Sequence, residues 1–175
     1  MSKVAFMTIG LLKAPRGDEQ VQGFFDRSPA IISGAEVSPG FIARSFYDER
    51  TWGTISNPTI FQDEEFEDMT PQTQSSWQDL ESVFAFAYRG VHAEAMRKRN
   101  EWFVKPEWPT YVAWWIADGH TPSWEEAYQR YDQLHQQGAS AEAFDFKHPF
   151  GADGQPVKID RQRVKEIKAQ YTYQQ

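Results

Sequence analysis

The stretch from Asp79 to Phe103, DLESVFAFAYRGVHAEAMRKRNEWF, constrains the fold more than any other part of this chain. Its apolar residues recur with the period of an α-helix, so we expect one long amphipathic helix facing a core. The apolar stripe comprises Leu80, Val83, Phe84, Ala87, Val91, Ala95 and Trp102. Asp79 suits the N-cap position, because its carboxylate can accept a hydrogen bond from an amide of the first turn. Pro106 disfavours helical geometry at Lys105, so the helix should end before it.

Three reactive side chains, Tyr88, His92 and Arg99, share one flank of this predicted helix. In projection they lie about 80–120° from the apolar stripe, at the boundary of the core. His92 is a candidate general acid or base, because an imidazole titrates near neutral pH. Tyr88 could donate a hydrogen bond, and Arg99 or Arg89 could hold an anionic oxygen. The alternative is structural: these side chains tie the helix to neighbouring loops.

The chain is rich in aromatic residues, at 15%, including seven tryptophans. Flat apolar rings are suited to the walls of a ligand pocket. The candidate ligand-binding residues are Arg89, Trp102, Trp77, Trp114, Trp115 and Arg44. Arg44 stands out in an otherwise apolar predicted strand, which indicates either an edge strand or an arginine that reaches into a polar cavity.

Composition excludes several other functions. A net charge of −7 argues against unspecific nucleic-acid binding, which needs a basic surface. The absence of cysteine excludes disulfides and thiolate metal sites, and the four histidines lack paired ligand spacing, so no metal site is expected. The apolar N-terminal run is too short to span a bilayer and lacks a cleavage site. We therefore expect a cytoplasmic protein.

The order of predicted elements is strand, helix, strand, loop, strand, long helix, strand, helix. The strands are Val4–Leu12, Phe41–Phe46, Thr70–Trp77 and Thr110–Ala117, and the shorter helices are Asp18–Val37 and Ser123–Gln137. Pro29 should kink or restart the first of these helices. Ser123 and Glu126 form a candidate capping box. This order predicts an α+β, ferredoxin-like fold, an antiparallel four-stranded sheet covered by helices.

The strand Thr110–Ala117 is apolar on both faces, so both faces should be covered, one of them by another sheet or subunit. We therefore expect a homodimer. Residues 1–150 should form one domain, and 151–175 a polar C-terminal extension that is dispensable for folding. The acidic segment Tyr47–Met69 is expected to be a solvated loop.

Five stretches carry a resemblance to a known family: TIGLLKAP, SPGFIARS, FAYRGVHAEAMRKRNEWF, YVAWWIADGHTPSWEEA and AFDFKHPF. Together they resemble a bacterial domain-of-unknown-function family (family 3291) of the dimeric α/β-barrel superfamily, which also holds antibiotic-biosynthesis monooxygenases, chlorite dismutases and aldoxime dehydratases. The resemblance covers roughly Val4–Phe150. It implies a homodimer whose two sheets face each other as a barrel, with a pocket between the sheet and the helices of each subunit. It implies no particular reaction, because fold and function separate.

Three functions stay open. The first is a monooxygenase-like enzyme that acts on a hydrophobic small molecule in a pocket beside the long helix. The second is a non-catalytic protein that binds a small molecule or another protein, which the lack of Ser-His-Asp and glycine-loop signatures favours. The third is a haem-dependent enzyme with His92 or His120 as axial ligand. The sequence itself requires no cofactor.

Overall fold

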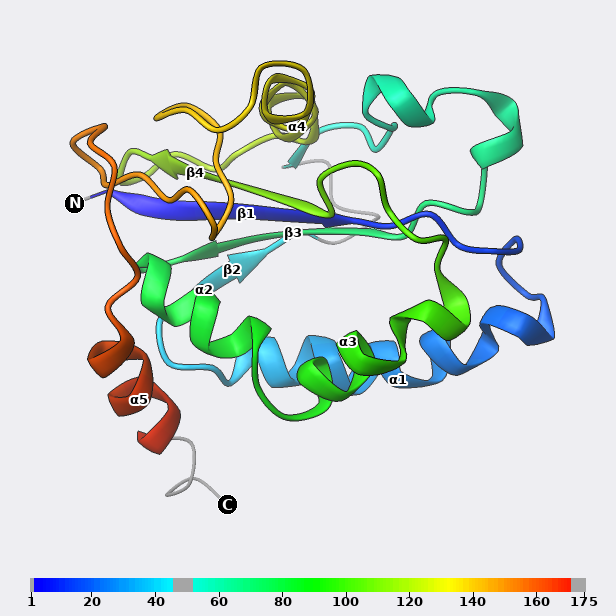
Figure 1. The fold of residues 1–175 in the computed structure, drawn as a ribbon, viewed down its shortest axis with the longest axis horizontal. Coiled ribbons are helices and arrows are strands. Elements are labelled where there is room, and N and C mark those ends of the chain that lie inside the picture. The colour runs from blue at the N-terminus through cyan, green and yellow to red at the C-terminus, as the bar shows by residue number, and fades with distance from the viewer. Residues whose placement is uncertain (1, 46–51, 171–175) are drawn as a thin grey trace.

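The computed structural model describes residues 2–45 and 52–170, and its centre is one antiparallel sheet (Figure 1). Its four strands, in the order β2-β3-β1-β4, are β1 (Lys3–Ile9), β2 (Phe41–Arg44), β3 (Gln72–Trp77) and β4 (Tyr111–Ile116). Helix α1 (Glu19–Glu36) connects β1 to β2, and helices α2 (Leu80–Ala87) and α3 (Gly90–Trp102) connect β3 to β4. This is the ferredoxin-like arrangement, so the predicted α+β fold is confirmed.

The prediction of one helix over 79–103 is wrong, because the chain breaks between α2 and α3. Arg89 is extended at φ −137°, and Gly90 follows at φ +53°, in the left-handed region that glycine enters without steric cost. The predicted N-cap is confirmed, since the Asp79 carboxylate accepts from the Ser82 amide at 2.7 Å. Helix α3 ends at Trp102, before Pro106, as predicted.

Helix α4 (Trp124–Gln137) covers one face of the sheet together with the segment 52–69 (Figure 1). Ser123 caps α4, accepting from the Glu126 amide at 3.1 Å, and Gly138 ends it at φ +82°. The segment 52–69 contains two short helical turns, η2 (Thr59–Phe61) and η3 (Glu64–Phe66), and it packs on the sheet through buried aromatic rings. Its acidic side chains are exposed, as expected. The end of the predicted strand at Phe46 and residues 47–51 lie outside the described residues.

This face forms one continuous core, here called the α4-side core. It joins alternate residues of β1 and β4 to the buried face of α4: Ala5, Met7, Ile9, Val112, Trp114, Trp124 and Tyr131. The chain itself therefore covers a face for which the sequence predicted a second sheet or subunit. The homodimer stays a prediction, but this apolar face no longer requires it.

The opposite face of the sheet carries α1, α2, α3 and α5 (Arg161–Gln170) (Figure 1). Two separate apolar clusters form there. The α2 cluster includes Val4, Phe6, Trp77, Leu80, Val83, Phe144 and Ile167. The α1–α3 cluster includes Leu12, Ala14, Val21, Ala95 and Trp102. Helix α1 continues through Pro29 and does not restart there.

Helix α5 lies within the predicted C-terminal extension and packs against α2. Ile167 is 1% exposed and Val164 is buried beside it. Lys168 donates to the backbone oxygen of Tyr88 at 3.1 Å. The boundary at residue 150 stays a prediction, but this packing leads us to expect that the extension stabilises the fold. Across the described residues, no helix has the length and apolarity to cross a bilayer.

Candidate functional site

A row of hydroxyl groups crosses the helix-covered face of the sheet between the two apolar clusters. Tyr111 of β4 pairs with Thr8 of β1, and Thr8 pairs with Thr73 of β3. The Thr8 and Thr73 hydroxyl oxygens lie 2.7 Å apart. Thr73 is exposed, and it lies beyond the last described pair of β2 with β3, Arg44 with Ser75. Solvent therefore reaches the sheet at this position, and we name the open surface around the hydroxyl row the helix-side cleft.

Aromatic rings stand beside the hydroxyl row. The Phe146 ring lies over Phe6 and Tyr111, with centroid distances of 5.6 Å and 5.0 Å. Helix α1, which crosses the same side, leaves most of its apolar face only half-buried: Phe24, Phe25, Ile31 and Ile32. A polar floor with flat apolar surroundings is typical of a site for a small aromatic molecule.

Tyr111 is a hydrogen-bond donor at the end of the row. Burial is the main cause that raises the pKa of its phenol, and the nearby Tyr88 and Asp145 raise it further. The Phe146 amide donates to the Tyr111 oxygen at 3.2 Å and partly opposes that shift. The phenol therefore keeps its proton at neutral pH. Sequence reasoning placed Tyr111 only on an apolar strand face, because the pairing with Thr8 is not readable from spacing.

His92 lies near the start of α3, on the flank of the stripe that holds the buried Ala95 and Trp102. Its Nδ1 is 2.7 Å from the Ala87 oxygen. A carbonyl can only accept, so Nδ1 carries the proton and Nε2 offers its lone pair. Burial lowers the pKa of His92, opposed by the bond to Ala87. No described residue forms a hydrogen bond to Nε2, so the group is a neutral base.

The surroundings of His92 place it between the two clusters. Its ring centroid is 5.0 Å from that of Phe86, which stacks on Trp77 at 5.3 Å in the α2 cluster. In the other direction along α3, the stripe runs into the α1–α3 cluster. His92 is half-buried, and its predicted role at a cavity stays a prediction.

Of the other predicted catalytic residues, Arg99 still shares a helical row with His92, whereas Tyr88 does not, because it lies outside α3. Tyr88 lies in the break, is exposed, and packs on Phe84 with a centroid distance of 4.6 Å. Arg99 is exposed, two turns along α3. Arg89 is half-buried at the N-cap of α3. Their roles stay predictions, and the broken helix removes the geometric reason for grouping Tyr88 with His92.

The predicted ligand-binding tryptophans lie mainly in cores. Trp77, Trp102 and Trp114 are buried, and the Trp114 indole donates to Glu126 Oε1 at 2.8 Å on the α4 side. Trp115 is half-buried and donates to the Phe150 oxygen at 2.8 Å. A ligand-binding role for them stays a prediction that this packing does not support.

Arg44 lies in the edge strand β2, which agrees with the edge-strand interpretation. It pairs with Ser75, and its Nε donates to Glu36 Oε1 of α1 at 2.7 Å. A bulge between Phe41 and Ala43 interrupts the register just before it. The guanidinium therefore joins the edge of the sheet to α1.

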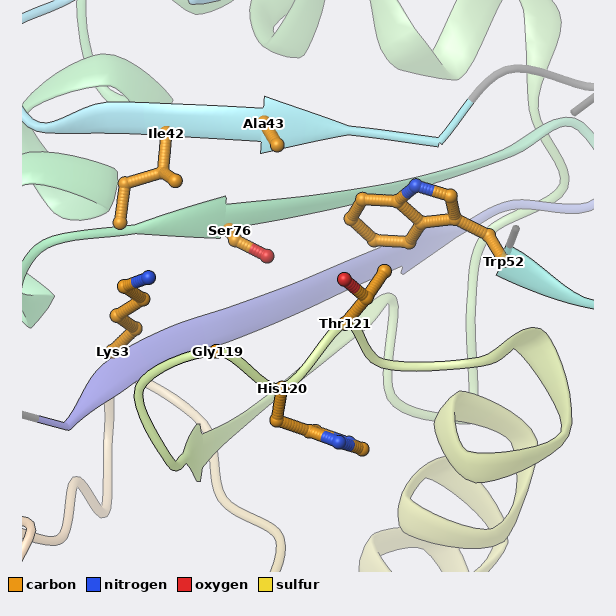
Figure 2. A pocket seen from close by; sticks show the side chains of 8 residues that line it. All are labelled: Lys3, Ile42, Ala43, Trp52, Ser76, Gly119, His120 and Thr121. Atoms are coloured by element: carbon orange, nitrogen blue, oxygen red, sulfur yellow. The ribbon is translucent and has the colours of Figure 1, made fainter.

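A small pocket of about 120 Å³ opens on the α4 side of the sheet (Figure 2). Its lining includes Lys3, Ile42, Trp52, Ser76, His120 and Thr121. His120 Nε2 lies 2.7 Å from Glu126 Oε2, so the imidazole bridges the β4–α4 turn. Within residues 2–45 and 52–170, no three histidine, aspartate or glutamate side chains group in a way that could hold a metal ion.

Comparisons with solved structures give distant likenesses. The NE2512 protein of unknown function from Nitrosomonas europaea is 14% identical, with a TM-score of 0.46, over 70% of this chain and 97% of that chain. SnoaB, a cofactor-independent oxygenase from Streptomyces nogalater, is 11% identical, with a TM-score of 0.42, over 69% and 97%. A dabb family protein with a ferredoxin-like fold from Mesorhizobium loti is 9% identical, with a TM-score of 0.41, over 69% and 100%. These values bear on neither substrate nor reaction.

A search of curated proteins found no match. The family comparison is decisive, because one family model, Domain of unknown function (DUF3291), matches residues 3–161 and so spans nearly the whole chain. The chain therefore belongs to the family described as Domain of unknown function (DUF3291).

Proposed function

We propose that this protein binds a flat, largely apolar small molecule in the helix-side cleft and acts on it as an enzyme, with His92 as the base. The observation that carries the proposal is the exposed Thr8–Thr73 hydroxyl pair, 2.7 Å apart, on the helix-covered face of the sheet. A face shaped only by packing would bury apolar side chains there. Solvent-accessible hydroxyl groups beside aromatic rings are instead suited to a flat ligand that carries polar substituents.

The chemistry follows from the protonation states. His92 is neutral and its Nε2 is unprotonated, so it can take a proton from an acidic O–H or C–H group of the ligand. Tyr111 keeps its proton and can donate to the oxygen on which negative charge develops. The resulting anion is more easily oxidised than the neutral molecule.

The specific reaction that we propose is monooxygenase-like. The ligand RH₂ and dioxygen would give RO and water, so the ligand supplies every electron and no external reductant is needed. Tyr88, Arg89 and Arg99 keep the roles predicted from the sequence, as donors to ligand oxygens at the edge of the cleft.

Binding is tested first, with 1,8-dihydroxyanthraquinone as a flat probe whose absorbance changes in a protein site. Thr73→Val removes the exposed hydroxyl and should raise the Kd about fivefold, the value of one neutral hydrogen bond. Thr121→Val makes the same change on the opposite face and should leave the Kd unaltered. Equal Kd values for the wild type and both variants would place the probe elsewhere.

Turnover is tested by dioxygen uptake with 1,4-dihydroxynaphthalene, measured above the uncatalysed rate. His92→Asn can still donate to the Ala87 oxygen but cannot accept a proton, so it should lower the rate about 100-fold while the fold is retained. Saturable binding without dioxygen uptake would identify the second candidate, a non-catalytic binding protein. Soret absorbance of the purified protein would identify the third, a haem-dependent enzyme.

The homodimer is also part of the proposal and rests on the family resemblance. Light scattering at micromolar concentration checks it, and a monomeric mass would remove it. A cytoplasmic location likewise stays a prediction, which fractionation of cells that express the protein would check.

A further inference from the structure

We propose that the pocket on the α4 side of the sheet is a second ligand site, and that it takes a small organic carboxylate. It lies on the face opposite the helix-side cleft, so it is separate from the function proposed above. Strands β1, β2 and β3 form its floor, and the β4–α4 turn forms one wall. Figure 2 shows the side chains of Trp52, Ser76 and Thr121 directed toward one hollow, with Lys3 and Ile42 at its other end.

Ser76 provides the strongest indication of a ligand. It is only 5% exposed and lines the pocket. Figure 2 shows this hydroxyl pointing into the hollow. The hydroxyl is open to the pocket, so a ligand group that accepts a hydrogen bond from Ser76 would replace water there. The Thr121 hydroxyl lies across the hollow.

Lys3 gives the pocket its preference for an anion. Its ammonium lies 2.7 Å from Asp118 Oδ1, and this contact is the main cause that lowers the pKa of Asp118. The Asp118 side chain is 63% exposed, whereas that of Lys3 is 28% exposed. An ion pair with such an exposed carboxylate contributes little free energy. A ligand carboxylate can therefore replace Asp118 beside Lys3 at little cost in stability. In this proposal the ligand carboxylate takes over from Asp118 as the partner of the Lys3 ammonium.

Glu126 of α4 does not oppose an anion in the pocket. Both carboxylate oxygens of Glu126 already have partners. Oε1 accepts a hydrogen bond from the Trp114 indole, and Oε2 lies beside the His120 imidazole. In Figure 2 the His120 imidazole points away from the hollow, toward α4. Lys3 is therefore the charged group that faces the ligand, together with its present partner Asp118.

The wall formed by the turn is held from both sides. Gln74, 1% exposed beneath the turn, donates to the Pro122 and Ser123 oxygens at 3.0 Å and 3.2 Å. His120 holds the turn to Glu126 of α4 at 2.7 Å. Gly119, at φ +81°, allows the chain to reverse there. A wall fixed in advance reduces the entropy that a ligand must lose on binding.

The size of the pocket limits the ligand. A cavity of roughly 150 Å³ holds benzene, so about 120 Å³ admits a single small ring or a short aliphatic chain. The Trp52 indole and Ile42 offer apolar contact for that part, while Lys3, Ser76 and Thr121 receive the carboxylate. The chemistry thus matches a short-chain or single-ring carboxylic acid.

The test uses benzoate and butyrate as probes, with benzamide as the neutral counterpart of benzoate. Titrations followed by amide NMR should show saturable shifts at Ser76, Gly119 and Thr121, and none at Thr8 or Thr73. Lys3→Met keeps the apolar stem but removes the charge, so it should raise the benzoate Kd at least about tenfold. Ser76→Ala should raise it about threefold or more.

Lys165→Met is the matched control, because Lys165 is an exposed lysine of α5, across the sheet from the pocket (Figure 1). It should leave the benzoate Kd unchanged, as should Thr73→Val. The proposal is overturned if neither carboxylate saturates, if benzamide binds as tightly as benzoate, or if folded Lys3→Met and Ser76→Ala variants both bind like the wild type. Loss of anthraquinone binding in Thr73→Val would not affect it.

Discussion

The two faces of the sheet differ in how completely they are covered, although they share the same strands. On the α4 side, Met7 and Gln74 pair across β1 and β3 and are completely enclosed. One residue further along, Thr8 and Thr73 form the next pair on the helix side, and Thr73 is exposed. Two neighbouring residue pairs of the same ladder thus differ: one pair is buried, and the next includes an exposed side chain. The open space must come from the helices, since the strands are common to both faces.

The break at Gly90 explains how the helix side stays open. Helix α2 contacts β3 and α5, and so closes one end of the sheet. Helix α3 turns away after Gly90 and packs on α1, which reaches the sheet mainly at the edge strand β2. In an unbroken helix, α2 and α3 would share one axis. The break lets one half seal the sheet while the other half forms the outer side of a cleft.

The largest expected contrast comes from matched phenylalanine truncations on the two faces. Phe61 is 2% exposed in the α4-side core, so Phe61→Ala should lower the free energy of unfolding by about 4 kcal/mol. Phe24 is only half-buried, so Phe24→Ala should cost about half as much. Urea unfolding measures both free energies. Equal costs would show that the helix side is packed as tightly as the α4 side.

Removal of the C-terminal segment tests the closed end of the helix side. Truncation before Pro156 exposes the α2 cluster and removes the buried Ile159, Val164 and Ile167. After the lost chain entropy is counted, we expect a loss of about 3 kcal/mol, a fall in Tm of roughly 10 °C. Val157→Ala, at a half-exposed site, is the control. An unchanged melting temperature would instead support a dispensable extension.

The helix break predicts opposite signs for two glycine substitutions. Gly90→Ala places alanine at a positive φ, with free space around the new methyl group, and should cost about 1 kcal/mol. Gly34→Ala lies within α1, also with free space, and should stabilise by about 0.5 kcal/mol. Thermal unfolding compares the two. Stabilisation by both would mean that residues 79–103 form one continuous helix.

The pH dependence of stability gives the smallest effect and concerns His92. Burial lowers its folded pKa below the ordinary value of 6.5, so the unfolded chain binds a proton first as the pH falls. The contribution of His92 is complete above about pH 6.5 and is lost as the pH falls through the folded pKa. Unfolding measurements on the wild type and His92→Asn should diverge in that window. Parallel profiles would mean that His92 titrates like an exposed histidine.

Local signals in the sequence predicted much of the fold. Asp79 and Ser123 are caps because a short polar side chain reaches a free amide of the first turn, and that rule holds in any context. The order of elements along the chain followed from apolar runs separated by turns, except for the polar strand Thr70–Trp77, which was predicted from its position before a capped helix. The break at Gly90 was not predicted, because the apolar period continues across it and one glycine inside a helical pattern is usually tolerated.

The candidate site was only partly predictable. His92 was singled out because an imidazole, a phenol and a guanidinium fall in one row at the core boundary, and its role stays a prediction. The hydroxyl row was missed because Tyr111, Thr8 and Thr73 come from three strands and meet only through the register of the sheet. The pocket at Ser76 was not predicted for the same reason, since its lining comes from separate segments of the chain.

Thiol reactivity tests the central claim, that the helix side of the sheet is open at Thr73, most directly. The chain contains no cysteine, so Thr73→Cys and Gln74→Cys each introduce one thiol at neighbouring positions of β3. We predict that the thiol at 73 reacts with a disulfide reagent at least about 100-fold faster than the thiol at 74, because only the exposed position is accessible without opening of the fold. 1,8-Dihydroxyanthraquinone should slow the reaction at 73 alone. Equal protection of both thiols in the folded protein would contradict the cleft.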